Sequence, residues 1–329
     1  MDIVVAIDLG TSRSAWAFSI QGRAQDTVLI RVPAGSVPSP SSVKTETAVL
    51  LSPDDHEVLA FGNAAHARYL EEIEGIEDDN VNLGTGIGSP PNITASNTND
   101  HVQGNPMLFR WFKMELCTNG GFQSVNDPVA VSECGRALPL LVVMGAILRH
   151  FKNDVLAYLS TVFEVDHYIK EVMWVVTIPA IYDDFARRFM RVAAHKAGLI
   201  NTVDSPQLRL CLEPEAAYLA VGIKDDPERF QPGNQMMIVD CGGGTVDITT
   251  HEVLSTTPLR LKEIRPPTGG PWGSTYVDKA FVAWLEVFLG DEIFRSVRRT
   301  GSFLDFLEKW EAQKTRFGGT EPDMVKLNM

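Results

Sequence analysis

Residues 236–253 read MMIVDCGGGTVDITTHEV, where three glycines interrupt two runs that otherwise look like β-strands. Glycine weakens a strand, so three in a row indicate a turn whose backbone must stay bare. The turn would consist of Gly242, Gly243, Gly244 and Thr245, and a concave array of uncovered N–H groups binds anions such as phosphate. Walker and Rossmann loops are excluded, because a helix follows their glycines whereas TVDITTHEV continues as a strand. A plain Gly-rich hairpin remains the alternative for this motif alone.

A second Asp-x-Gly turn stands near the start of the chain, where VVAIDLGTS repeats the pattern of MMIVDCGGGT. In each stretch four apolar residues lead to an aspartate, Asp8 or Asp240, and a glycine, Gly10 or Gly242, follows two positions later. A second strand follows each turn. Two such strand pairs, one in each half of the chain, predict a duplicated α/β unit with a cleft between the halves.

The two aspartates indicate what a bound phosphate must bring with it. Two like charges about 4 Å apart repel by ~1 kcal/mol in water and by ~4 kcal/mol at an effective dielectric constant near 20. Asp8 and Asp240 would therefore repel a polyphosphate unless a divalent cation lay between them. Mg²⁺ suits this place because it keeps most of its water and binds few carboxylates together with phosphate oxygens. The sequence predicts a Mg-nucleotide between two hairpins, with Thr11, Ser12 and Thr245 as hydroxyl donors.

Composition narrows the class of protein. The 329 residues are enough for two domains, and 44% hydrophobic with 22% charged residues is ordinary for a globular protein. The net charge of −13 argues against a nucleic-acid or anionic-membrane surface. The longest apolar stretch, residues 137–148, is too short for a membrane span, and no signal peptide is recognisable, so we expect a cytoplasmic location. Four scattered cysteines predict buried, reduced thiols rather than a disulfide or a zinc site.

The order of predicted strands and helices divides the chain into two lobes. We expect the first lobe of a nucleotide-binding domain at residues 1–223, with an inserted subdomain at about 33–120. A polar linker at 224–234 leads to a partial second lobe at 235–329. Within the insertion, residues 84–104 are poor in apolar side chains and predict an exposed loop.

Four stretches in this order resemble the phosphate-one, connecting and phosphate-two motifs of the 70 kDa heat-shock chaperones: AIDLGTS, VVTIPAIYDD, LEPEAA and VDCGGGTVD. That family belongs to the actin-like ATPase superfamily. FKMEL, PAIYDDFARRFMRVAAHKAGL and TGGPWGSTYVDKAF are similar to its divergent heat shock 70 kDa protein 12 branch. The resemblance implies an α/β actin-like ATPase fold, in which mixed sheets flanked by helices form duplicated ribonuclease-H-like units, with the second lobe incomplete.

The resemblance also implies ATP or ADP with Mg²⁺ as ligands and assigns roles to residues. Asp8 and Asp240 would hold the hydrated metal, Glu213 and Asp247 would order the metal shell and the attacking water, and Lys113 would face the phosphate. A helix-start charge for Glu213 and a solvated lysine for Lys113 are the alternatives. The implied nucleotide-binding positions are Gly10, Thr11, Ser12 and Arg13 in the first turn, Gly242, Gly243, Gly244 and Thr245 in the second, Gly270 and Gly273 in a turn closing on the nucleotide, and Glu311 and Lys314 on the adenosine side. For the last two residues, the surface of an amphipathic helix is the alternative.

Two departures from the family affect what we expect this chain to do. Arg13 and Ser12 replace an aromatic residue and a threonine, and no second connecting segment or adenosine loop precedes Met329, so we expect weak nucleotide binding and little turnover. The leading hypothesis is an ATP-binding, chaperone-like stress-response protein with protein clients, in which ATPase activity is left open. The alternatives are a non-catalytic scaffold or regulatory protein that keeps the fold, a sugar or small-metabolite kinase, in which IDLGTS also occurs, and a filament-forming actin-like protein.

Overall fold

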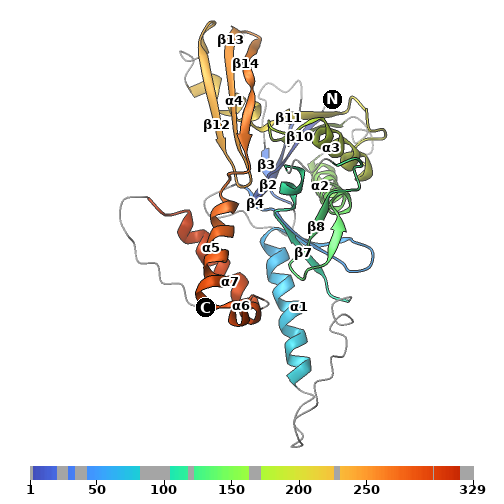
Figure 1. Cartoon of the computed structure of the whole chain (residues 1–329). Coiled ribbons are helices and arrows are strands. Elements are labelled where there is room, and N and C mark those ends of the chain that lie inside the picture. The colour runs from blue at the N-terminus through green and yellow to red at the C-terminus, as the bar shows by residue number, and fades with distance from the viewer. Residues whose placement is uncertain are drawn as a thin grey trace, which may run out of the picture.

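The structure is a computed structural model that describes residues 3–20, 29–33, 43–81, 104–117, 122–162, 172–225, 230–298 and 300–318. Most of the polar insertion predicted as an exposed loop, residues 84–103, lies outside the described residues. Figure 1 shows the chain, with the sheet of the second half standing apart from that of the first.

The first sheet is mixed and has the strand order β11-β10-β1-β2-β3, with β4 also pairing with β2. β1 and β2 form the predicted antiparallel hairpin, whereas β10 runs parallel to β1 and β11 runs parallel to β10. A three-stranded meander extended by parallel strands on the far side of β1 is the ribonuclease-H-like arrangement, so the predicted actin-like fold class is confirmed. The strands are β1 (Ile3–Leu9), β2 (Arg13–Ile20), β3 (Leu29–Arg31), β4 (Thr45–Glu46), β10 (Val172–Ile178) and β11 (Leu208–Leu212).

Helices cover this sheet and bury its apolar side chains. The odd-numbered residues of β1, from Ile3 to Leu9, lie in one core cluster with Val143, Ile147 and Phe151 of the central helix. The helices are α2 (Leu140–Val162), α3 (Asp184–Lys196) and α4 (Glu213–Asp225). Asp183 caps the N-terminus of α3, because its carboxylate accepts a hydrogen bond from the Ala186 N–H at 2.8 Å.

A smaller sheet and one long helix form most of the segment between β4 and α2. The sheet has the order β6-β5-β7, and η1, a short 3₁₀ helix, follows its last strand. The elements are β5 (Ala48–Leu51), β6 (Val58–Phe61), α1 (Asn63–Val81), β7 (Met107–Arg110), η1 (Phe112–Leu116), β8 (Val129–Val131) and β9 (Ala137–Pro139).

The second half begins with an antiparallel meander, followed by three helices that lie beside α1 in Figure 1. Leu307 of the last helix packs against the apolar cluster of α1, β5 and β7. The elements are β12 (Gln235–Cys241), β13 (Val246–Thr256), β14 (Leu259–Gly270), α5 (Thr275–Leu289), α6 (Asp291–Val297) and α7 (Gly301–Lys314).

The two meanders match in sequence but differ in burial. Val5 and Ile7 of β1 are fully buried, whereas the equivalent Met237 and Val239 of β12 are 65% and 50% exposed. Among the described residues β12 pairs with β13 alone, so no parallel strand extends this meander there as β10 extends the first.

Two composition-based expectations can be compared with the structure. The four cysteines are free thiols as predicted, but the expected burial is wrong: Cys241 is exposed on the edge strand β12 and the other three are only partly buried. Within the described part of the chain, no helix is long and apolar enough to cross a membrane.

Candidate functional site

The two glycine-containing turns meet face to face. A Cβ atom added to Gly243 would lie 1.9 Å from Ser12 Oγ, and one added to Gly244 would lie 2.5 Å from Thr11 Oγ1. Real Cβ atoms do not approach other atoms so closely, so only glycine fits at either position. The bare backbone is therefore needed for the turns to touch, which adds a packing reason to the predicted anion-binding one. The two turns thus meet where the sequence predicts a cleft between the halves.

The loop that precedes α5 forms backbone hydrogen bonds with the second turn. The N–H groups of Gly273, Ser274 and Thr275 donate to the carbonyl oxygens of the turn glycines, at 3.0, 3.2 and 2.8 Å. A Cβ atom on Gly273 would lie 2.4 Å from the Gly243 backbone, and one on Gly270 would lie 2.6 Å from the Trp272 ring. The structure thus places Gly273 against the second turn and Gly270 beside an aromatic ring, where both allow close packing.

Each hairpin contributes an aspartate at the end of its first strand. Asp8 accepts a hydrogen bond from the Thr177 hydroxyl at 2.9 Å and forms an ion pair with Lys44 through its other oxygen. Burial raises the pKa of Asp240, and the negative charges of Asp247 and Asp8 raise that pKa further. The two predicted metal-binding aspartates therefore share one electrostatic environment.

Lys113 and Glu213 form an ion pair, and Asp8 and Asp240 act electrostatically on Glu213. Lys113 Nζ lies 2.6 Å from Glu213 Oε1, and the lysine is only 1% exposed, so its alternative interpretation as a solvated helix lysine is wrong. Trp111 turns the chain into the 3₁₀ helix with a left-handed backbone, φ 54°, and so directs Lys113 inward. Burial raises the pKa of Glu213, and Lys113 opposes this rise.

Asp247 stands directly opposite Asp240 in the β12–β13 pair and is 1% exposed. Its Oδ1 accepts the backbone N–H of Ile181 at 3.0 Å, across from the loop that follows β10. This contact joins the second hairpin to the first half of the chain, so one oxygen of Asp247 already has a structural partner.

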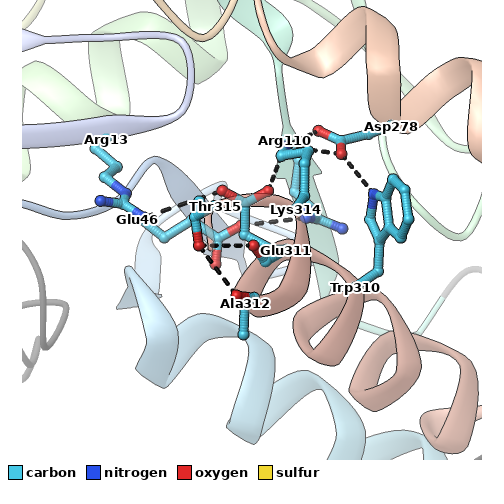
Figure 2. A network of polar contacts seen from close by, with 9 residues as sticks. All are labelled: Arg13, Glu46, Arg110, Asp278, Trp310, Glu311, Ala312, Lys314 and Thr315. Atoms are coloured by element: carbon cyan, nitrogen blue, oxygen red, sulfur yellow. Dashed lines mark hydrogen bonds and ion pairs between the residues drawn. The ribbon is translucent and has the colours of Figure 1, made fainter. Parts of the chain in front are cut away.

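The residues predicted on the adenosine side belong to a polar network that spans the two halves of the chain (Figure 2). Lys314 Nζ lies 2.8 and 2.9 Å from the two carboxylate oxygens of Asp278, to which Trp310 also donates at 2.8 Å. Lys314 also pairs with Glu311, which approaches Arg13 of the first hairpin at 4.0 Å. The side chain of Lys314 is only 14% exposed, so an ordinary amphipathic surface does not describe it, whereas Glu311 is 43% exposed.

Sequence reasoning missed Lys44, Thr177 and Asp278. Thr177 had a usable signal, because it is a polar residue inside the otherwise apolar run VMWVVTI of a buried strand. Lys44 and Asp278 had none, because their contacts with Asp8 and Lys314 join segments 36 residues apart in both cases.

The side chains fit a hydrated Mg²⁺ but not a cage made of protein ligands. Across the described ranges, no group of three or more His, Cys, Asp or Glu side chains could enclose a metal ion. Mg²⁺ needs only one or two carboxylates when water and phosphate complete its shell. The mutual repulsion that raises the pKa of Asp240 is relieved by a cation at this position.

A protein-family model and a solved structure are each similar to part of this chain. The family model described as Hsp70 protein matches residues 124–256. Among solved structures, the match to MreB 5 of Spiroplasma citri bound to AMPPNP covers 87% of this chain and 57% of the MreB chain, with 11% identity and a TM-score of 0.43. The first sheet has the strand order of the actin-like ATPase fold, and residues 124–256 are similar to the Hsp70 family.

Two relatives of the heat shock 70 kDa protein 12 type are similar to this chain. Heat shock 70 kDa protein 12A of Mus musculus is 28% identical over 95% of this chain and 50% of its own length. Heat shock 70 kDa protein 12B of Homo sapiens is 26% identical over 99% of this chain and 51% of its own. The chain is thus similar to the heat shock 70 kDa protein 12 type along almost its whole length, and spans about half the length of these relatives.

Proposed function

We propose that this chain binds ATP or ADP with Mg²⁺ between its two glycine hairpins, as a chaperone-like protein of the heat shock 70 kDa protein 12 type. The observation that carries the proposal is the close approach of Gly243 and Gly244 to Ser12 and Thr11. A role with protein clients in the cytoplasm belongs to the same proposal, and the names of the heat shock relatives support its stress-response part.

The proposed binding uses the main chain and hydroxyl groups of both turns. The phosphates would lie against residues 10–13 and 242–245, where N–H groups and the hydroxyls of Thr11, Ser12 and Thr245 can donate. Asp8 and Asp240 would hold Mg²⁺ through its water shell, and the ion would neutralise phosphate charge. The adenosine would lie toward Glu311 and Lys314.

Hydrolysis is the finer part of the proposal. In phosphoryl transfer, a protein mainly positions the reactants and stabilises charge, and water attacks the γ-phosphate in line with the leaving oxygen. Glu213 would accept a hydrogen bond from that water, and the buried ammonium of Lys113 would balance charge on the transferred phosphoryl group. The 2.6 Å contact between Lys113 and Glu213 keeps the two side chains next to each other.

Calorimetric titration with ADP, with and without Mg²⁺, tests the binding. We expect Mg²⁺ to strengthen ADP binding in the wild type, and Asp8→Asn combined with Asp240→Asn to lower the affinity for Mg-ADP at least about tenfold, since each carboxylate makes charge-assisted contacts with the metal shell. Asp54→Asn, on the exposed turn between β5 and β6, is the control and should leave the affinity unchanged.

A wild-type chain that binds neither ADP nor ATP at millimolar concentration would contradict the proposal. The non-catalytic scaffold would then be favoured, and its partner binding should be indifferent to the two Asp→Asn substitutions. If ADP binds, release of phosphate from ATP in the wild type, compared with Glu213→Gln, tests the hydrolysis step.

A further inference from the structure

Lys44 lies beside Asp8, at the place where the metal is expected. Its ammonium forms a hydrogen bond and an ion pair with Asp8 Oδ2, while Asp8 Oδ1 accepts from Thr177. The positive charge of Lys44 also acts on Asp240, whose pKa it lowers against the larger effect of burial. The positive charge of Lys44 therefore acts on the carboxylates of both hairpins.

The backbone around Lys44 is fastened to the first turn. Thr45 and Glu46 pair with Ser14 and Arg13 in the antiparallel β4–β2 ladder, directly after the lysine. The N–H of Thr47 donates to the carbonyl oxygen of Ser12 at 2.9 Å, and the Thr47 and Ser14 hydroxyls lie 2.6 Å apart. The position of Lys44 is thus set by the hairpin it serves.

The side chain of Lys44 lies partly in solvent. It is 40% exposed, and that of Asp8 is 34% exposed, so solvent and ions reach the pair. Lys113, the other lysine of the site, differs because it is 1% exposed and held by Glu213. Lys44 can therefore leave its carboxylate at a modest cost, whereas Lys113 cannot.

We infer that Lys44 acts as a counter-cation for Asp8 and Asp240 when no divalent metal is bound. When the metal is present, Lys44 competes with it for Asp8. This inference deepens the proposed function and rests on it for the nucleotide, but the competition itself requires only the metal and the two carboxylates. It follows that Lys44 sets how strongly nucleotide binding depends on Mg²⁺, because the ammonium supplies part of the charge that the metal otherwise supplies.

Binding of Mn²⁺, a paramagnetic substitute for Mg²⁺, tests the competition without nucleotide. Electron paramagnetic resonance would measure the free Mn²⁺ remaining in solutions of wild type, Lys44→Met and Lys44→Arg. Removing an adjacent positive charge from a partly screened site should raise Mn²⁺ affinity about tenfold in Lys44→Met. Lys44→Arg keeps the charge and should stay near the wild type. Lys262→Met removes an exposed lysine on β14 and controls for net charge.

A second arm measures ADP affinity in excess Mg²⁺ and in excess chelator. Lys44→Met should weaken metal-free ADP binding, so that the ratio of the two affinities grows about tenfold over the wild type. Circular dichroism melting establishes that each variant is folded before it is titrated.

The two arms separate the inference from the proposed function. An unchanged or weakened Mn²⁺ affinity in Lys44→Met, or no Mn²⁺ binding by either protein, would overturn the inference. If Mn²⁺ affinity rises in Lys44→Met but no protein binds ADP, the role of Lys44 stands and the nucleotide proposal fails.

Discussion

Lys113→Met is expected to lower the free energy of unfolding by about 3–5 kcal/mol, because it leaves a mostly buried carboxylate without its partner. Lys113 is 1% exposed, and its ammonium lies 2.6 Å from Glu213, whose pKa burial already raises. Losing the lysine removes the interaction that opposes this rise. Urea unfolding with an unchanged m-value would measure the loss of stability.

Two further variants make the Lys113 prediction specific. Replacing both partners, Lys113→Met with Glu213→Gln, should recover most of the stability, since no buried charge is then left unpaired. Lys309→Met breaks an exposed i,i+4 pair with Asp305 and should cost less than about 1 kcal/mol. A loss below about 1 kcal/mol for Lys113→Met itself would show that Glu213 is solvated or paired elsewhere.

The second large effect is expected for Gly243→Ala, where one methyl group forces the two turns apart. The added Cβ would meet Ser12 Oγ at 1.9 Å, Ser12 Cβ at 2.6 Å and the Ser12 backbone nitrogen at 3.2 Å. Overpacking of this kind costs about 1–3 kcal/mol, which corresponds to roughly five- to 150-fold in affinity if the crevice opens to relieve it. Calorimetry with Mg-ADP would measure the loss.

Gly104→Ala is the matched control for Gly243→Ala. Nothing lies within 4 Å of the Cβ position at Gly104, so the same chemical change should leave Mg-ADP affinity unchanged. Equal ADP affinity in Gly243→Ala and the wild type would contradict the account, because a phosphate site shared by both turns cannot tolerate their separation.

The features that the sequence predicted are those encoded locally. An Asp-x-Gly turn between two apolar runs identifies a hairpin within about twenty residues, and its repetition identified Asp8 and Asp240 as equivalent positions. The two matching hairpins follow from such local patterns.

The features that the sequence could not predict depend on distant pairing. Lys44 reaches Asp8 only because β4 adds to the edge of β2, and Asp247 meets Ile181 across 66 residues of sequence. The burial of Lys113 depends on the left-handed backbone at Trp111. Glycine or asparagine at that position would have indicated such a conformation, but tryptophan does not. Lys314 was expected to face adenosine, but its pairing with Asp278 requires α7 to pack against α5. The types of residues in the sequence do not by themselves specify these contacts between distant segments.

We propose that one metal-bound polyphosphate lies between the two aspartate-bearing hairpins. A crystal structure of the chain with Mn²⁺ and ADP, with data collected at the manganese absorption edge, tests it most directly. We expect one anomalous peak between the carboxylates of Asp8 and Asp240, with the diphosphate against the main chain of residues 242–245. A nucleotide bound elsewhere, or a metal peak remote from both aspartates, would contradict it.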